Sequence, residues 1–202
     1  MNTPVKAPVG DHLLIVDDDR LILAMLASGL QRAGYRVTTA ESEEDAQELL
    51  TGGERPDLAV LDVHLPVGCG LSLAQRLRDF DHIPFVMFSA YSDSATVSKA
   101  TELGALGYMV KPLSINQMVP TIEAALLRSA ELRALKTATH QLQKALDMER
   151  DVNVAVGLTM NQYRMGREAA FNMLRNAARA QSCKLCEIAA AVISASEVIH
   201  KK

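Results

Sequence analysis

Short runs of apolar residues alternate with amphipathic segments through the first 125 residues of the chain. The apolar runs have the length and composition of strands buried on both faces, and they fall at 12–16, 35–40, 57–62, 83–89 and 107–110. Between them, apolar residues recur at helical spacing over 19–33, 43–51, 70–79 and 93–103, and again from about 114. Five successive β-α units predict an α/β fold with a doubly wound, five-stranded parallel sheet, whose functional residues lie at the carboxyl ends of the strands.

The pattern changes near residue 121, because residues 121–156 contain no Gly or Pro and are mostly good helix formers. Apolar or small residues there alternate at spacings of three and four, the pattern of a coiled-coil seam. The seam positions are Leu132, Leu135, Thr139, Leu142 and Leu146, followed less regularly by Glu149, Asn153, Val156 and Met160. We therefore predict a coiled-coil linker helix over 129–152, the alternative being a long helix packed on its own domain. Pro120 precedes it, so the last helix of the first domain is expected to start late or to kink.

Two further helical patterns follow Gly157, at about 166–180 and 183–197, with short connections. Together with the end of the preceding helix they predict a small, all-α, three-helix domain over 150–197. The chain therefore divides into an α/β domain at 11–128, the linker helix and this helical domain.

Charge separates the two ends of the chain. Residues 1–130 contain 10 Lys or Arg and 17 Asp or Glu, whereas residues 131–202 contain 11 and 7. A polyanionic partner is therefore expected to bind the second part. No secretory leader or apolar stretch of membrane-spanning length is present, which predicts a cytoplasmic protein with no membrane partner.

The three cysteines include the pair Cys183 and Cys186, spaced as a CxxC. A structural zinc site needs four ligands, and no second such pair lies nearby in the sequence. We interpret these residues as two reduced thiols on a helix.

Acidic, hydroxyl and basic residues follow the predicted strands at their carboxyl ends. Asp17 and Asp18 follow the first strand and Asp62 the third, while Ser89 and Lys111 end the fourth and fifth. Carboxylates this close raise one another's pKa unless a cation joins them, and Mg²⁺ suits such a set. A carboxylate nucleophile, a metal, a hydroxyl and an ammonium group together suit phosphoryl transfer onto a carboxylate. Solvated charges at loop ends would explain one such residue more easily than five.

The segments IVDDD, LDVHLPVGCG, FSAYS and GALGYMVKP resemble the receiver domain of two-component response regulators, over about residues 11–128. The resemblance implies a flavodoxin-like fold phosphorylated by a sensor histidine kinase, with Asp62 as phosphoacceptor. It implies that Asp17, Asp18, Asp62 and the main-chain carbonyl of His64 hold Mg²⁺, and that Ser89 and Lys111 bind the phosphoryl group. Tyr108 would be the switch aromatic, Lys111–Pro112 a cis peptide, and Pro66 and Gly70 the turn after the acceptor. His64 and Tyr91 would flank the water that hydrolyses the phosphoryl group, with Tyr91 shielding it.

The second part of the chain resembles the ANTAR domain, the output of the AmiR and NasT transcription antitermination regulators, over residues 150–197. The residues at its characteristic positions are Ala155, Met160, Ala170, Leu174, Ala177, Ala178, Ile188 and Ala189. This sequence departs from the family pattern at Thr159, where Leu is usual, and at Arg179, where Met is usual. Arg179 is therefore expected either to contact RNA or to alter the helix packing.

Positive charge predominates between residues 155 and 185, where Glu168 is the single acidic residue. Guanidinium groups pair with phosphate and stack on unpaired bases, so these residues are candidates for contact with an RNA loop. The candidates are Arg164, Arg167, Arg175, Arg179 and Lys184.

These observations predict a response regulator that binds paired RNA stem-loops in a leader transcript when phosphorylated and causes transcription antitermination. The linker helix would pair two copies into a homodimer. The chain is not expected to be an enzyme, apart from self-phosphorylation from a phosphodonor and dephosphorylation at Asp62. The alternatives are a helical output that binds DNA or one that binds a protein as an adaptor.

Overall fold

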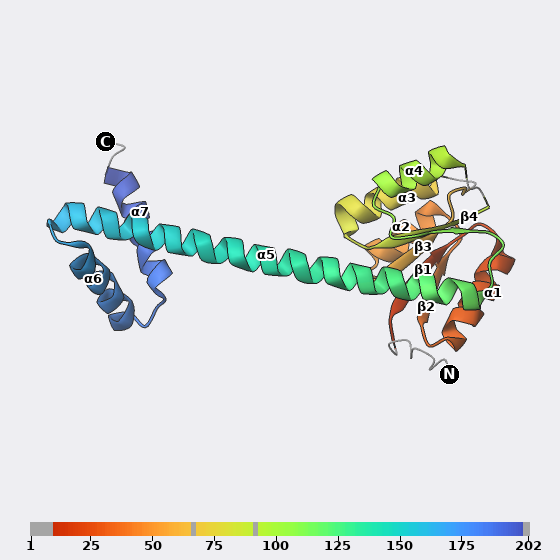
Figure 1. The fold of residues 1–202 in the computed structure, drawn as a ribbon, viewed down its shortest axis with the longest axis horizontal. Coiled ribbons are helices and arrows are strands. Elements are labelled where there is room, and N and C mark those ends of the chain that lie inside the picture. The colour runs from red at the N-terminus through yellow and green to blue at the C-terminus, as the bar shows by residue number, and fades with distance from the viewer. Residues whose placement is uncertain (1–9, 66–67, 91–92, 200–202) are drawn as a thin grey trace. The chain divides into compact units, whose positions relative to one another are not determined.

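The computed structural model describes residues 10–65, 68–90 and 93–199. The chain forms two compact units, residues 1–133 and residues 134–202, which we call the sheet unit and the helical unit. The boundary falls inside one continuous helix, α5, which runs from Ile115 to Tyr163 (Figure 1). Each unit is described by itself below.

A five-stranded parallel sheet forms the centre of the sheet unit, as the sequence predicts. Its strands are β1 (His12–Val16), β2 (Arg36–Ala40), β3 (Leu58–Leu61), β4 (Phe85–Ser89) and β5 (Tyr108–Val110). They lie in the order β2-β1-β3-β4-β5, so the direction of winding reverses between β1 and β3. Ligands of such sheets bind at this reversal, outside the carboxyl ends of the strands.

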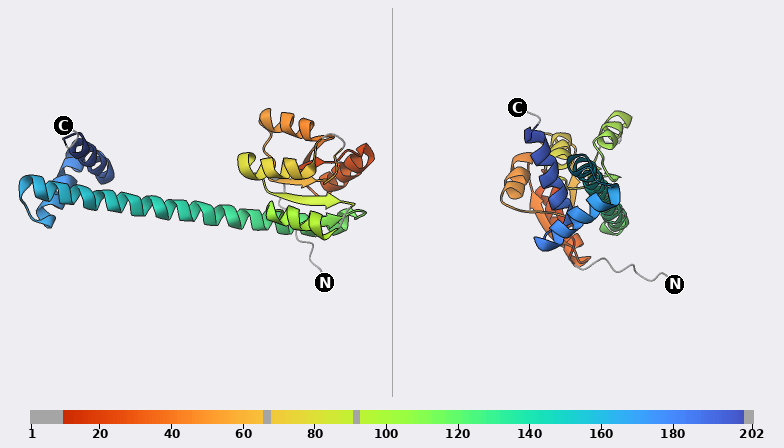
Figure 2. Two further views of the ribbon diagram at one scale, coloured as in Figure 1. Left: turned by 90° about the horizontal axis from the view of Figure 1, so that it is seen from above. Right: turned by 90° about the vertical axis from the view of Figure 1, so that its left-hand side faces the viewer.

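Helices cover both faces of the sheet (Figures 1 and 2). The helices before α5 are α1 (Arg20–Arg32), α2 (Glu43–Thr51), α3 (Gly70–Arg76) with a π-helical turn at Leu77–Asp81, and α4 (Ser94–Glu102). One core joins α2, α3 and α4 to alternate strand residues such as Leu14 and Val16. The other joins α1 and α5 to the residues between them, such as Leu13 and Ile15. Because both faces are buried, the residues of β1, β3 and β4 are buried throughout rather than in alternation, whereas the edge strand β2 is largely accessible.

Side-chain caps start the helices directly after the strands. Asp19 accepts hydrogen bonds from the main-chain N–H groups of Leu21 and Ile22 at the start of α1. Ser42 and Asp93 cap α2 and α4 in the same way, each accepting from one main-chain N–H group. The capped starts keep the strand-to-helix loops short, so the residues between a strand and its helix stay at the sheet edge.

The long helix α5 begins at Ile115, five residues before Pro120. The helix thus begins where the apolar spacing predicts, the late start does not occur, and Pro120 lies inside the helix at a solvent-exposed position. Every residue from 130 to 151 is exposed, which contradicts the alternative of a helix packed on its own domain. The seam leucines Leu132, Leu135, Leu142 and Leu146 are 43%, 62%, 63% and 52% exposed.

The helical unit consists of the end of α5 with α6 (Arg167–Ala180) and α7 (Leu185–Ile199), which confirms the predicted all-α arrangement. Its core contains mostly small and branched residues, which let the helices approach closely: Ala155, Val156, Ala170, Leu174, Ala178, Ile188 and Ala189. Among the described residues, no helix is both long and apolar enough to cross a membrane.

The two departures from the ANTAR pattern are accommodated differently. Thr159 is buried, and its hydroxyl donates to the main-chain carbonyl of Ala155 at 2.8 Å, so the polar group is satisfied within α5. Arg179 is exposed, although the preceding Ala178 is buried. The arginine therefore does not enter the helical core.

Two glycines allow a matched test of backbone packing. A Cβ at Gly70 would clash with the carbonyl oxygen of Asp62, whereas a Cβ at Gly157 in α5 would meet nothing within 4 Å. We expect Gly70→Ala to lower the free energy of unfolding of the sheet unit by about 1–3 kcal/mol. Gly157→Ala should raise that of the helical unit by about 0.5–1 kcal/mol. Urea denaturation followed by circular dichroism measures both, and unchanged stability of Gly70→Ala would show that the backbone relaxes freely there.

Candidate functional site

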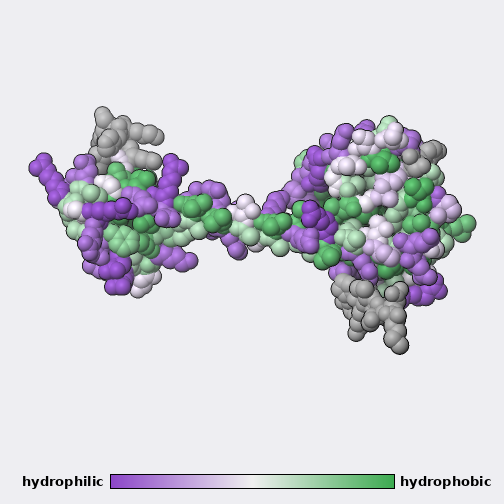
Figure 3. Space-filling model, in the orientation of Figure 1, coloured by the Kyte–Doolittle hydropathy of each residue, from purple (hydrophilic) through white to green (hydrophobic). Residues whose placement is uncertain are grey.

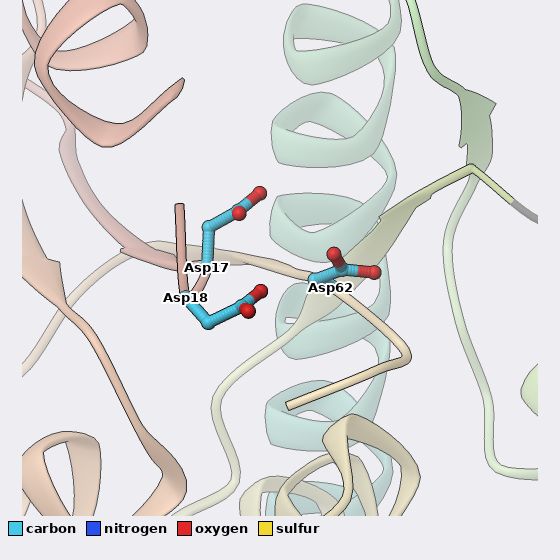
Figure 4. A group of neighbouring side chains, drawn as sticks. All are labelled: Asp17, Asp18 and Asp62. Atoms are coloured by element: carbon cyan, nitrogen blue, oxygen red, sulfur yellow. The ribbon is translucent and has the colours of Figure 1, made fainter. Parts of the chain in front are cut away.

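Three carboxylates meet at the carboxyl edge of the sheet, where the winding direction reverses. Asp17 and Asp18 follow β1, and Asp62 follows β3, so the pairing of these strands brings them together (Figure 4). One carboxylate oxygen from each lies within 4.8 Å of the others. Asp17 and Asp62 are buried, while Asp18 is exposed. The structure thus brings together the three acidic residues that the sequence singles out.

Lys111 links the two buried carboxylates. Its ammonium group donates to Asp17 Oδ2 at 2.5 Å and to Asp62 Oδ2 at 2.6 Å, and lies 5.2 Å from the centre of the Phe88 ring. Burial alone would lower the pKa of Lys111, but these hydrogen bonds raise it above its ordinary value. The lysine is therefore charged at neutral pH. The Lys111–Pro112 peptide is cis, as expected.

The pKa of Asp17 is raised by burial, and the hydrogen bonds from Lys111 and from the main-chain N–H of Asp19 oppose that rise. The nearby Asp62 acts in the same direction as burial. A cation at this point therefore relieves two unfavourable effects at once, the burial of Asp17 and its repulsion by Asp62.

Ser89 and Tyr108 lie on the same rim. Ser89 is fully buried at the end of β4, and its carbonyl accepts from the main-chain N–H of Lys111 at 2.8 Å. Tyr108 begins β5 and is half-buried. Burial raises the pKa of the Tyr108 hydroxyl, and a hydrogen bond with the Ser89 side chain works in the opposite direction. The switch candidate and the hydroxyl candidate are therefore in direct contact.

Main-chain hydrogen bonds hold the loop that follows Asp62 in place. The main-chain N–H of His64 donates to Asp62 Oδ1 at 3.3 Å, and the His64 side chain is exposed. The main-chain N–H of Gly70 donates to the carbonyl of Val63 at 3.1 Å, which places Gly70 against the backbone of Asp62. Pro66 and Tyr91 lie outside the described residues.

Glu43 is a contributor to this region that the sequence analysis missed. Its Oε2 accepts from the main-chain N–H of Cys69 at 3.0 Å and from the Ser72 hydroxyl at 2.6 Å. A Cβ at Gly68, where φ is +91°, would lie against this carboxylate. Glu43 thus ties the first turn of α2 to the loop that follows Asp62. The run Gly68-Cys69-Gly70 was the available sequence signal, since it marks a loop that another group approaches closely.

The donor set at the sheet edge fits Mg²⁺. Carboxylate oxygens are ligands that this ion prefers, and it binds through few of them while keeping its own waters. The exposed Asp18 and the two buried carboxylates present such oxygens within 4.8 Å of one another. Lys111 is the competing cation at the same oxygens.

The five cations singled out in the helical unit are all exposed. Arg175 and Arg179 lie one turn apart on α6, Arg164 lies in the α5–α6 connection with φ of +52°, and Lys184 directly precedes α7. Arg167 donates from Nη2 to Asn153 Oδ1 at 3.1 Å. The side chains of the other four make no ion pair or hydrogen bond with any residue that the structure describes.

Comparison with known proteins identifies both units. Residues 13–123 match the response regulator receiver domain family, and residues 140–193 match the ANTAR domain family. The chain is 30% identical over 191 residues to the transcriptional regulatory protein PdtaR of Mycobacterium tuberculosis, covering 95% of this chain and 93% of that protein. It is 40% identical over 116 residues to the transcriptional regulatory protein AfsQ1 of Streptomyces coelicolor, covering 57% of this chain and 51% of that protein.

Solved structures give the same result for the sheet unit. The N-terminal domain of a response regulator/sensory box/GGDEF 3-domain protein from Carboxydothermus hydrogenoformans is 31% identical, with a TM-score of 0.56, covering 60% of this chain and 99% of that one. The chemotaxis response regulator CheY4 of Vibrio cholerae is 27% identical, with a TM-score of 0.53, covering 57% and 98%. The sequence, the strand order and these matches agree, and the chain belongs to the response regulators, with an N-terminal receiver domain and a C-terminal ANTAR domain.

Proposed function

We propose that phosphorylation of Asp62 controls the binding of RNA stem-loops by the ANTAR domain and thereby causes transcription antitermination. The observation that carries the proposal is the set of exposed cations in the helical unit that have no described protein partner. Exposed cations without a protein partner are available to neutralise the phosphates of a nucleic acid. The exposed cations belong to the same chain as Asp62, a buried carboxylate that accepts a hydrogen bond from Lys111.

Asp62 is the proposed phosphoacceptor. One carboxylate oxygen attacks the phosphorus of a phosphohistidine on a sensor histidine kinase, and the P–N bond to that histidine breaks as the new P–O bond forms. Mg²⁺ held by Asp17, Asp18, Asp62 and the main-chain carbonyl of His64 would offset the charge of the phosphoryl oxygens. The same site would accept the group from a small phosphodonor and return it to water.

Lys111 and Ser89 are the proposed ligands of the bound phosphoryl group. The Lys111 ammonium already contacts Asp62, so it can shift to a phosphoryl oxygen over a short distance. The Ser89 hydroxyl must turn to donate to the phosphoryl group, which changes its hydrogen bond with Tyr108. Tyr108 would therefore report phosphorylation at the surface that contains β5.

RNA is the proposed ligand of the second domain. Arg175 and Arg179 project from neighbouring turns of α6, a spacing that suits successive phosphates or a phosphate and a base face. Paired short stem-loops in a leader transcript would suit a protein that presents two such surfaces. The DNA-binding and adaptor alternatives become outcomes of the binding tests below.

A homodimer through α5 is proposed as the link between phosphorylation and binding. The leucines at the seam are more than two-fifths exposed, which is costly for a surface that stays in water. Thr139, Glu149 and Asn153 interrupt the seam, so the pairing is expected to be weak alone and easily biased by the receiver domain.

Replacement of the acceptor tests the first step. Asp62→Asn should abolish labelling by radioactive acetyl phosphate with Mg²⁺, because the amide offers no anionic nucleophile. Asp79→Asn, which changes an exposed carboxylate outside the pocket, is the control and should label normally. Acid-stable labelling that persists in Asp62→Asn would place the acceptor elsewhere.

Sedimentation with and without beryllofluoride, a phosphoryl mimic, tests the dimer. The mimic should shift wild-type protein toward the dimer, and Leu142→Lys should prevent the shift by placing a charge in the seam. Gln141→Lys adds the same charge beside the seam and should leave the shift intact. A tight dimer under both conditions would show that phosphorylation acts by another route.

Arg175→Ala tests the RNA surface, with an RNA of two short stem-loops chosen from transcripts that co-purify with the protein. The variant should bind several-fold more weakly, lower the salt slope of binding by about one unit and keep its melting temperature. Arg175→Lys should keep the salt slope and lose part of the affinity, because it retains the charge without the guanidinium fork. Weak salt dependence of the wild type would favour the protein adaptor, and equal affinity for duplex DNA would favour the DNA-binding alternative.

A further inference from the structure

A hollow on the helical unit lies where the three helices of the ANTAR domain meet. Its volume is about 410 Å³, within the range of about 300–1,000 Å³ that is typical of small-molecule sites. It is lined by residues of α5, of α6 and of the start of α7: Met148, Glu149, Val152, Asn153, Phe171, Lys184, Leu185 and Cys186. Figure 3 shows apolar and strongly hydrophilic residues side by side on the surface of this unit.

We propose that this hollow holds one unpaired base of the bound RNA, stacked on Phe171. The inference rests on the proposed function and names a subsite within it. The occupant is a nucleobase because the lining combines an aromatic ring, aliphatic walls, one acceptor and two donors in a space next to free cations.

Phe171 provides the stacking surface. A small domain with little core has few large apolar side chains to bury, yet Phe171 is 37% exposed. Met148 on the facing helix is exposed to the same extent. An aromatic ring left partly open in a basic surface is the usual platform for single-stranded bases, since every base has a flat π face.

The position of Phe171 on α6 aligns it with the cations. Phe171, Arg175 and Arg179 follow one another at intervals of four residues, so they form one ridge along the helix. Neighbouring positions on such a ridge are about 5–6 Å apart. A nucleotide can therefore place its base on Phe171 and its phosphate near Arg175.

Three polar groups surround the apolar lining. Arg167 donates to Asn153 Oδ1, which leaves the Asn153 amide nitrogen as a donor toward the hollow. The Lys184 ammonium is a second donor without a described partner, because only the main-chain N–H of this residue contacts Glu187. Glu149 is an acceptor at the same hollow and makes no described hydrogen bond. A base edge that carries both N–H groups and a carbonyl matches this arrangement.

The test uses the stem-loop RNA of the preceding section with 2-aminopurine placed at each unpaired loop position in turn. Stacking quenches the fluorescence of this base. Wild-type protein should quench one loop position strongly on binding. Phe171→Leu keeps an apolar side chain but removes the ring, so it should abolish the quenching and weaken binding roughly five- to a hundred-fold. It should leave the salt slope unchanged, unlike Arg175→Ala.

Met173→Leu is the matched control, because Met173 is 41% exposed and lies on nearly the opposite side of α6. It should retain both quenching and affinity. Glu149→Gln provides a second variant at an exposed position, and it should change the preference for the base at the quenched position while the protein stays folded. Because Glu149 is also a seam position, sedimentation of this variant separates an effect on dimerisation from an effect on the base.

The outcomes separate this inference from the proposed function. Salt-dependent RNA binding with no quenched loop position, or with quenching retained in Phe171→Leu, overturns the base subsite and leaves RNA binding intact. If the wild-type protein does not bind the RNA at all, the proposed function itself is overturned. Loss of quenching in Phe171→Leu at an unchanged salt slope, with normal behaviour of Met173→Leu, supports the subsite.

Discussion

The contact of Lys111 with two buried carboxylates is the interaction on which the receiver domain depends. The neighbouring strands β1 and β3 end at the same edge of the sheet, and Asp17 and Asp62 directly follow them with very little access to water. Two such charges repel each other, and a cation between them offsets that repulsion. Removing one partner of a buried ion pair generally costs about 3–5 kcal/mol. The same contact thus stabilises the sheet edge and holds a positive charge against the Asp62 carboxylate.

The strands and the acidic pocket were predictable because their signals are local. An apolar run followed by a carboxylate marks a strand end, and parallel pairing then brings such ends together whatever the rest of the chain does. Glu43 was not predictable in this way, because its contacts with Cys69 and Ser72 join segments 26 and 29 residues away. The apolar spacing predicted the start of α5 near residue 114, and Pro120 did not delay it, since Met118 and Ile122 on either side of the proline pack against the sheet.

In the ANTAR domain, too, some features could be predicted from the sequence and others could not. Its core was foreseeable from the spacing of Ala155, Ala170 and Ala178, whereas the hollow beside Phe171 depends on three helices meeting at their surface. Sequence spacing identifies which side of one helix is buried. Sequence spacing does not show which exposed side chains on different helices lie next to one another. From the sequence alone, Asn153 was therefore interpreted only as an irregular position of the coiled-coil seam. The structure adds its contact with Arg167, which lies 14 residues further along the chain.

The exposed leucines of α5 have a consequence for the cell that makes this protein. Under the proposed pairing, an interrupted seam gives a weak dimer, so mass action governs how many copies are paired. The abundance of the regulator then becomes a second input beside the sensor kinase. Doubling its synthesis would raise the share of paired copies at a fixed level of stimulus. A gene for such a protein is therefore sensitive to its own expression level, and control of its promoter becomes part of the signalling circuit.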